Sequence, residues 1–275
     1  MEKAKILYVS QEIFPYLPDS EMSRIGRALP EGVMQYGKEF RTFMPRFGKI
    51  NERRNQLHEV IRLSGMNIVI DDTDHPLIIK VASIQAIRMQ IYFIDNDDYF
   101  TEKTTVRREN GEEYPENDER SIFFARGVLE TSRKLGWAPE IIHLNGWFTM
   151  FVAVFVRYYM NKDPHFSKSR IVITIYDDEF VSKWDGEIQK KLYVEGMDEK
   201  GLSTIKVDDY VSLMKMAIDL CDGVVQGSAK VNEELVAYAK ASGKPFLEYH
   251  DEASLAKACS DFYDLVLATP SEYIK

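Results

Sequence analysis

Short strand-like runs alternate with helical patterns along most of this chain, and this alternation constrains the fold more than any other feature. The runs are AKILYV near residue 4, EFRTFM near 39, EIIHL near 140, RIVITIY near 170, DGVVQ near 222 and PFLEY near 245. Strands that alternate with helices are typical of parallel sheets, because parallel neighbours need a crossover connection. The sequence therefore predicts an α/β fold built on a single doubly wound, Rossmann-like, mostly parallel sheet.

Residues from about 57 to 95 depart from this alternation. There HEVIRL, MNIVI, PLIIKVAS and IRMQIYFID follow one another with only turn-length gaps. Such close spacing is typical of antiparallel hairpins, so we expect a hairpin region inserted into the wound sheet. A last strand and helix are expected over 244–268. No linker, repeat or low-complexity tract marks a boundary in the sequence, and we expect one domain over residues 1–275.

Two helical segments are expected in the core. WFTMFVAVFV, at 147–156, is apolar on all sides, yet it falls short of the roughly 20 residues that cross a bilayer. VDDYVSLMKMAIDLC, at 207–221, carries an apolar stripe at helical spacing, formed by Tyr210, Leu213, Met214, Ala217, Ile218 and Cys221. Cys221 and Cys259 have no C-x-x-C partner, so we expect reduced core thiols. The first apolar run, Ile6 to Val9, is too short for a signal peptide, and a cytoplasmic location is expected.

Charge excludes one class of partner and leaves one cluster open. The formal charge of -9 is spread over short acidic clusters such as DDTD, DNDD, ENDE and YDDE, which argues against binding to a polyanion such as DNA. Positive charge gathers beside the second expected strand, at Arg41, Arg46, Lys49, Arg53 and Arg54. This cluster is either a phosphate-binding surface or a solvated one, and we favour the solvated surface.

Function is expected at the carboxyl ends of the strands, because ligands of open parallel sheets bind there. Those ends read SQEIFPY, PRFGK, NGWFT, YDDEF and QGSAK, a polar and aromatic collection. Amides and carboxylates pair with hydroxyl groups, and the ring of Trp147 or Phe148 could cover the apolar face of a sugar. Carbohydrate is therefore a sensible ligand. Asp177, Asp178 and Glu179 are either paired acids for acid-base chemistry or a charged turn.

A dinucleotide or P-loop site needs glycines just after a strand, so that backbone amides can approach a phosphate, and none follow the first strand here. That strand is followed by QEIFPYLPDSEMSRIG, in which Pro15 and Pro18 have no amide hydrogen and Asp19 and Glu21 would repel phosphate. A helix that begins near Ser20 could still accept an anion. The histidines have no metal-ligand spacing, and His143 is expected to be a core residue, so we expect no metal and no cofactor.

The order of several motifs resembles the amino-terminal catalytic domain of bacterial glycogen and starch synthases, from about Lys5 to Ala237. The matching segments are KILYVSQEIFPY, GRALPEGVMQYGKEFRTFMPRFGKI, IYFIDNDDYF, ENGEEYPENDERSIFFARGVLE, GWAPEIIHLNGWFT and LMKMAIDLCDGVVQGSAKVNEEL. The family's enzymes have two domains and transfer glucose from ADP-glucose or UDP-glucose to an α-1,4-glucan, with retention and without a metal. The resemblance implies the first half of such a glycosyltransferase, which holds much of the acceptor, whereas the second half holds most of the nucleotide. We expect this chain to stop before that second domain.

This sequence departs from the family at three motifs. The family's K-T-G-G loop, which meets the donor phosphates, aligns with Pro18, Asp19, Ser20 and Glu21. Its H-D-W-H-T aligns with residues 145–149, so the histidine at the reaction centre is replaced by Asn145. Its T-I-H-N aligns with residues 174–177, which places Tyr176 and Asp177 at the end of that motif. The resemblance therefore implies a degenerate donor loop and degenerate catalytic positions at Asn145, Tyr176 and Asp177.

Three hypotheses follow. The first is a glycogen or starch synthase-like protein, a hexosyltransferase homologue with ADP-glucose as donor that is weak or inactive by itself. The second is a non-enzymatic glucan-binding or regulatory partner of a glycosyltransferase. The third is new chemistry on Glu12 and the acids at 177–179. The sugar-binding candidates are Glu12, Tyr114, Asn145, Trp147, Thr149, Asp177 and Asp178, and framework motifs also retain Asn117 and Arg120. An α-glucan partner is expected, with nucleotide sugar doubtful, and the chain could form a homo-oligomer or serve as a separate glycosyltransferase subunit.

Overall fold

The computed structural model describes residues 3–274 and contains one ten-stranded sheet in the order β10-β9-β8-β7-β1-β2-β6-β5-β3, with β4 paired to β5. The strands are β1 Lys5–Ser10, β2 Glu39–Pro45, β3 His58–Glu59, β4 Met66–Ile70, β5 Thr73–Ile84, β6 Met89–Asp95, β7 Ile141–Asn145, β8 Arg170–Ile175, β9 Gly223–Gln226 and β10 Phe246–Leu247. Strands from β10 to β6 along this order are parallel, which confirms the predicted sheet.

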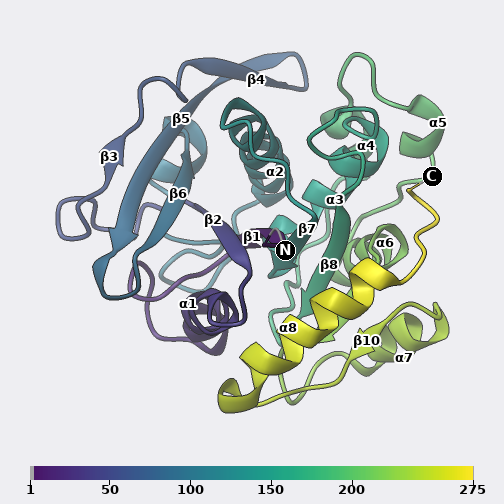
Figure 1. Cartoon of the computed structure of the whole chain (residues 1–275). Helices are drawn as coiled ribbons and strands as arrows, with labels where there is room; N and C mark the ends of the chain where they lie inside the picture. The colour runs from purple at the N-terminus through teal and green to yellow at the C-terminus, as the bar shows by residue number, and fades with distance from the viewer. Residues whose placement is uncertain (1–2, 275) are drawn as a thin grey trace.

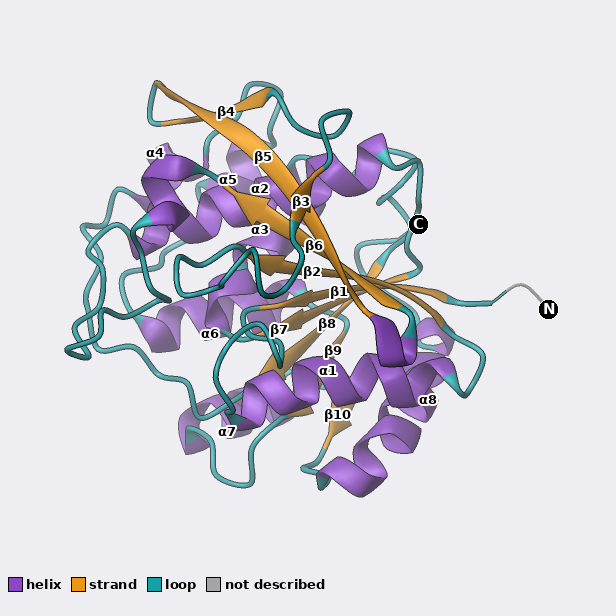
Figure 2. Cartoon of the chain, turned by 90° about the vertical axis from the view of Figure 1, so that its left-hand side faces the viewer, coloured by secondary structure: helices purple, strands orange, loops and turns teal. Residues whose placement is uncertain are grey.

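Helices cover both faces of the sheet, and Figure 2 shows α2 and α3 on one side with α1 and α8 on the other. The helices are α1 Glu21–Met34, α2 Asn117–Lys134, α3 Phe151–Tyr158, α4 Ile188–Leu192, α5 Glu199–Leu202, α6 Tyr210–Leu220, α7 Glu233–Ala241 and α8 Glu252–Ala268, with short turns η1 Gln85–Ile87, η2 Asp97–Thr101 and η3 Trp147–Thr149. Leu7 and Val9 of β1 point into the core under α2, α3 and α6, whereas Ile6 and Tyr8 point toward α1 and α8. Successive strand residues face opposite sides of the sheet, so both faces of β1 are covered by helices.

The hairpin region is confirmed, but it differs in detail from the prediction. It extends one end of the sheet, at the upper left of Figure 1, and its last strand, β6, returns parallel to β2. Asp71 and Asp72 both adopt positive φ, 47° and 63°, as a two-residue hairpin turn between β4 and β5 requires. HEVIRL was expected to be a full strand, yet only His58 and Glu59 pair with β5, because a turn begins at Ile61.

Other expected core features are confirmed. Helices η3 and α3 are buried along 147–157, and the apolar stripe of α6 lies in the core behind its amino-terminal cap, Asp209. His143 is fully buried, with its ring nitrogens 2.7 Å from the hydroxyls of Tyr263 and Thr174. Burial lowers the pKa of His143 to about 3, so this ring is neutral and structural. Cys221 and Cys259 are free and buried, and burial raises the pKa of each thiol to about 12.

Within residues 3–274, none of the helices is both long enough and apolar enough to span a bilayer.

Candidate functional site

A pocket of about 500 Å³ lies at the carboxyl ends of the central strands, where the sequence places function. The loops after β1, β7, β8 and β9 all contribute to it, together with the start of α1 and one segment before α2. The lining residues are Gln11, Glu12, Ser20, Glu21, Met22, Thr105, Val106, Arg107, Trp147, Tyr176, Asp177, Asp178, Glu179 and Ser228. We call this the acidic cleft.

The corner after β7 owes its shape to Gly146. Its φ of +85° is strained for any residue with a side chain, and a Cβ there would lie 2.8 Å from the Cβ of Gln11 and 2.9 Å from the sulfur of Met22. The side-chain oxygen of Gln11 accepts a hydrogen bond from the backbone N–H of Phe148 at 3.2 Å, which ties the corner to the loop after β1. Thr149 donates its hydroxyl to the carbonyl of Gly146 at 2.9 Å, so the hydroxyl proton of this sugar-binding candidate stabilises the turn.

Trp147 does not offer the stacking surface expected from the sequence. Its side chain is only 2% exposed, because the ring packs against Phe180 and Trp184 with centroids 4.7 and 6.2 Å away. What Trp147 presents to the acidic cleft is polar: its backbone N–H donates to Oδ2 of Asp178 at 3.0 Å. The ring is therefore a structural wall of the cleft, and stacking on a ligand would require that it be uncovered.

Asp178 is the most perturbed acid of the cleft. Its Oδ1 accepts a second hydrogen bond, from the hydroxyl of Tyr210 at 3.0 Å. Burial of the carboxyl group raises its pKa to about 7, and the nearby charge of Glu12 adds to the rise, although the hydrogen bonds oppose it. A carboxyl group that titrates near neutrality can exchange a proton at physiological pH. Asp177 and Glu179 on either side are exposed.

Two of the three positions aligned with the family's catalytic motifs, Asn145 and Tyr176, are closed to proton transfer near neutral pH. Asn145 is fully buried, and its side-chain oxygen accepts a hydrogen bond from the hydroxyl of Tyr176 at 3.4 Å. Burial raises the pKa of Tyr176 well above its usual value. An amide has no titration near neutrality, and a buried phenol keeps its proton. Asp177 donates its backbone N–H to the hydroxyl of Ser228, while its side chain stays in solvent.

Tyr114, a further sugar-binding candidate, lies outside the lining of the cleft. It is buried, its hydroxyl accepts from the backbone of Thr104 at 3.1 Å, and the guanidinium of Arg120 lies 4.9 Å from its ring centre. Arg120 is itself fully buried and donates to Asn117 and to the carbonyls of Tyr99 and Thr105. These framework residues hold the segment before α2 in place and do not line the acidic cleft.

Arg107 is a cleft residue that sequence reasoning missed. Its guanidinium donates to the carbonyl of Glu179 at 2.7 Å and to Glu113 at 3.2 Å. Within the described chain it is the one cation of the cleft lining. The backbones of Arg107 and Glu113 also form an isolated antiparallel bridge, and no local sequence pattern signals such a bridge.

The expected donor loop divides at Ser20. Pro18 and Asp19 point away from the cleft, where Asp19 pairs with Arg24 at 2.8 Å. Ser20 caps α1 and donates its hydroxyl to Glu12 at 2.6 Å, while Glu21 accepts from the hydroxyl of Ser228 at 2.6 Å. The helix start is therefore already capped and lies between two carboxylates, which disfavours an anion there.

The family is decided by comparison with known proteins. A family model described as the starch synthase catalytic domain matches residues 5–247. The chain belongs to the starch synthase catalytic-domain family. A glycogen synthase of Chlorobium limicola is 34% identical over 176 residues, which cover 63% of this chain and 36% of that protein. A glycogen synthase of Chlorobaculum tepidum is 30% identical over 265 residues, which cover 96% of this chain and 52% of the relative.

Solved structures agree about the fold of this starch synthase family member. The catalytic domain of starch synthase IV from Arabidopsis thaliana, bound to ADP and acarbose, superposes with a TM-score of 0.69 at 15% identity. The match covers 92% of this chain and 53% of that structure. At that identity the likeness shows the α/β fold. The chain spans about half the length of its longer-matching relatives, such as the 52% covered in Chlorobaculum tepidum glycogen synthase.

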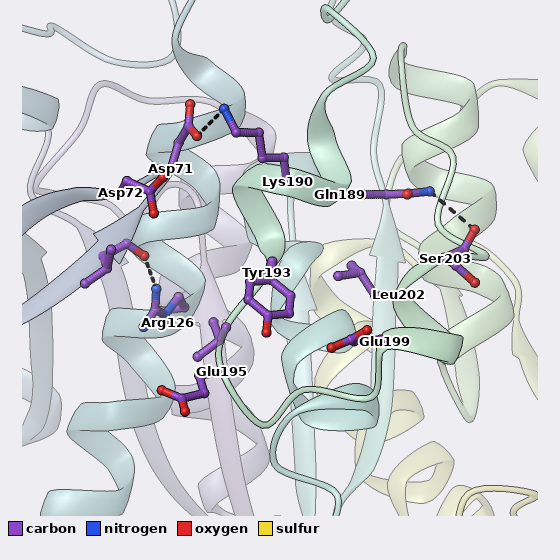
Figure 3. A pocket seen from close by; sticks show the side chains of 12 residues that line it. Asp71, Asp72, Arg126, Gln189, Lys190, Tyr193, Glu195, Glu199, Leu202 and Ser203 are labelled. Atoms are coloured by element: carbon purple, nitrogen blue, oxygen red, sulfur yellow. Dashed lines mark hydrogen bonds and ion pairs between the residues drawn. The ribbon is translucent and has the colours of Figure 1, made fainter.

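A second, larger pocket of about 900 Å³ lies among α2, α4, α5 and the β4–β5 turn, away from the strand ends (Figure 3). Its cations already have partners: Lys190 pairs with Asp71 at 2.6 Å, and Arg126 donates to the carbonyl of Val69. Gln189 likewise donates to the carbonyl of Ser203 at 3.3 Å. These contacts cross the pocket and join the hairpin region to the helical layer, so the polar groups of the pocket have a structural role.

Proposed function

We propose that this chain is a glycogen or starch synthase-like protein of α-1,4-glucan metabolism, which binds glucan in the acidic cleft and transfers glucose weakly or not at all by itself. One observation carries the proposal: the lining of the cleft gathers Glu12, Glu21, Asp177, Asp178 and Glu179, whereas its one cation within residues 3–274, Arg107, is already engaged. Like charges repel a diphosphate strongly in a partly desolvated pocket. A neutral sugar meets no such barrier.

The acidic cleft has the chemistry of a hydroxyl-binding site. Carboxylates accept hydrogen bonds from sugar hydroxyls, and the hydroxyl oxygens of Ser20 and Ser228, whose single protons go to Glu12 and Glu21, can each accept one more. These serines already bridge to Glu12 and Glu21, so the polar groups are held in place before a ligand arrives. Ligand binding then requires little ordering of side chains, which favours affinity.

The proposal is tested on the purified chain with three ligands. We expect retention on immobilised glycogen or amylose, no heat of binding with ADP-glucose in calorimetry, and no transfer of labelled glucose from ADP-glucose to glycogen. An active glycogen synthase serves as the positive control for both nucleotide assays. Measurable incorporation by this chain alone would refute the loss of activity, and failure to be retained on either glucan would refute glucan binding.

A non-enzymatic role as a glucan-binding or regulatory partner is the alternative that the same cleft supports. The chain would then act as a homo-oligomer or as a separate subunit of a glycosyltransferase. The proposed location is the cytoplasm, because the buried thiols of Cys221 and Cys259 are free. Mixing the chain with an active synthase would separate the roles, since a regulatory partner changes the initial rate of the synthase and a passive glucan binder does not.

Acid-base chemistry in the cleft is a second candidate function, favoured by the pKa of Asp178 of about 7. The chemistry would use Asp178 with Glu12, whose charges interact, and the exposed acids on either side, Asp177 and Glu179. Release of reducing sugar from a maltooligosaccharide, lost in Asp178→Asn and retained in Glu31→Gln, which changes an acid outside the cleft lining, would support this candidate. Equal rates in the wild type and in Asp178→Asn would exclude it.

A further inference from the structure

The basic cluster that the sequence places at residues 41–54 divides into held and free cations. Arg46 is buried and pairs with Asp95 at 3.0 Å, and Arg41 lies over the ring of Trp137 at 5.2 Å. Lys49, Arg53 and Arg54 are exposed, and in the described part of the chain no carboxylate lies within ion-pairing distance of them. Although the formal charge of the chain is -9, these three neighbouring cations have no acidic partner among residues 3–274.

Two of these free cations line a groove of about 450 Å³. One wall is the loop that carries Lys49 and Arg54, and the opposite wall is the loop after β1. The lining residues are Phe14, Pro15, Tyr16, Leu17, Pro18, Lys49, Asn51, Arg54 and Asn55. Arg53 is outside this lining. We call this site the basic groove. No residue lines both pockets, but the segment from residue 11 to residue 22 contributes to each: its ends line the acidic cleft and its middle, 14–18, lines the groove.

The basic loop is held in shape by its own amides. Oδ1 of Asn51 accepts from the backbone N–H of Arg54 at 2.8 Å, and Nδ2 of Asn55 donates to the carbonyl of Asn51 at 2.9 Å. These bonds leave the Asn51 amide nitrogen as a donor and the Asn55 amide oxygen as an acceptor, which is what hydroxyl groups need. Across the groove the ring of Phe14 is 37% exposed and offers an apolar face.

We propose that the basic groove binds a hexose phosphate. The phosphate would lie between Lys49 and Arg54, since Arg presents a fork of donors to phosphate oxygens and Lys adds a compact charge. The hexose hydroxyls would reach the free amide groups, and the apolar face of the sugar ring would cover Phe14. The volume of about 450 Å³ falls in the range of small-molecule sites and exceeds what inorganic phosphate alone would fill.

This site is independent of glucan binding in the acidic cleft, because the charges of the two pockets are opposite. A phosphate repelled by Glu12 and Glu21 on one side of the shared segment meets Lys49 and Arg54 on the other. Hexose phosphate binding in the groove therefore does not depend on glucan binding in the cleft, and glycogen retention measures only the cleft.

The test is calorimetric titration of the whole chain with glucose 6-phosphate, glucose 1-phosphate, inorganic phosphate and glucose at physiological ionic strength. We expect saturable binding of at least one hexose phosphate, at least tenfold tighter than inorganic phosphate or glucose. The double variant Lys49→Ala/Arg54→Ala should weaken that binding at least tenfold. Phe14→Ala should weaken the hexose phosphate about threefold and leave inorganic phosphate unchanged.

Arg53→Ala is the matched control, because it removes a neighbouring exposed cation that does not line the groove. It should leave hexose phosphate binding within twofold of the wild type. An effect as large as that of the double variant would overturn the proposal in favour of a diffuse basic surface. So would the absence of saturable binding by both hexose phosphates, or equal affinity for inorganic phosphate and hexose phosphate. Thermal unfolding of each variant checks that the loops still fold.

Discussion

The acidic cleft and the basic groove lie on either side of one short segment after β1, yet they differ in how their charges are held. In the cleft, Glu12, Glu21 and Asp178 each accept a hydrogen bond from a hydroxyl group and lack a cationic partner in the described residues. In the groove, Lys49 and Arg54 are exposed and have no acidic partner among residues 3–274. Charges organised by hydrogen bonds suit a neutral polyhydroxyl ligand, whereas free charges suit an oppositely charged one.

The largest effect should come from removing the wall of the cleft. Trp147→Ala deletes a ring packed against Phe180 and Trp184, and such truncations cost about 3–5 kcal/mol of unfolding free energy. Urea unfolding measures the loss. Tyr193→Ala removes a ring that is 47% exposed and should change stability by less than about 1 kcal/mol. If Trp147→Ala instead keeps its stability and loses glycogen retention, the ring contacts the ligand as the sequence suggests.

The next effect concerns the pH dependence of stability. The pKa of Asp178 is about 7 in the folded chain, against about 3.9 for an unfolded aspartate, so the folded state holds an extra proton between these values. Stability therefore falls as pH rises from about 4 to 7, by on the order of 2–4 kcal/mol.

Asp178→Asn should abolish this fall while keeping an acceptor for the Trp147 N–H. Urea unfolding across that pH range measures both curves, and Asp177→Asn, which removes an exposed neighbour, is the control. A wild-type curve parallel to that of Asp178→Asn would show that Asp178 titrates normally.

A charge change in the cleft should have a moderate effect. Glu21→Lys replaces a carboxylate of the lining by a cation, and we expect about tenfold tighter binding of ADP, equivalent to about 1.4 kcal/mol. Glu31→Lys makes the same change in net charge on the same helix, outside the cleft lining. Equal gains in both variants, measured by calorimetry, would mean that net charge and not the local lining excludes the nucleotide.

The smallest expected effect is a difference in how ionic strength changes ligand binding in the two pockets. Raising ionic strength from about 0.02 to 0.5 M shortens the range of charge interactions from tens of ångströms to a few. Hexose phosphate binding in the groove should weaken several-fold, whereas glycogen retention should stay within twofold because its hydrogen bonds are neutral on the ligand side. A salt response of equal size for both ligands would remove the distinction between the pockets.

Much of the fold was predictable because local pattern and burial agree. Strands β1, β7 and β8 are short apolar runs that are each followed by a helix, and such runs are buried on both faces of a parallel sheet. The predicted length of the HEVIRL strand was wrong because strand length there depends on the partner strand. Only His58 and Glu59 pair with β5, and the chain then turns. Apolar content alone does not reveal where a ladder stops.

The candidate site was predictable only where a residue follows a strand directly. Glu12 and Asp178 were found because β1 and β8 both run parallel to β7, so their carboxyl ends lie at the same edge of the sheet. Trp147 was misplaced because its burial depends on Phe180 and Trp184, which fold back from a later loop. Arg107 was missed for the same reason, since a distant carbonyl directs its side chain.

The position of β1 has a consequence for how the chain is assembled. Its neighbours are β2, close in sequence, and β7, which joins it through pairs such as Ile6 with Ile141. The contact between Lys5 and Glu140 spans 135 residues, so the middle of the sheet closes only after a long loop has been brought together. At about 5–20 residues per second on the ribosome, β1 waits on the order of ten seconds for this partner. Until β7 emerges, a strand that is buried on both faces in the folded chain has one open edge, which exposes the chain to aggregation during this interval.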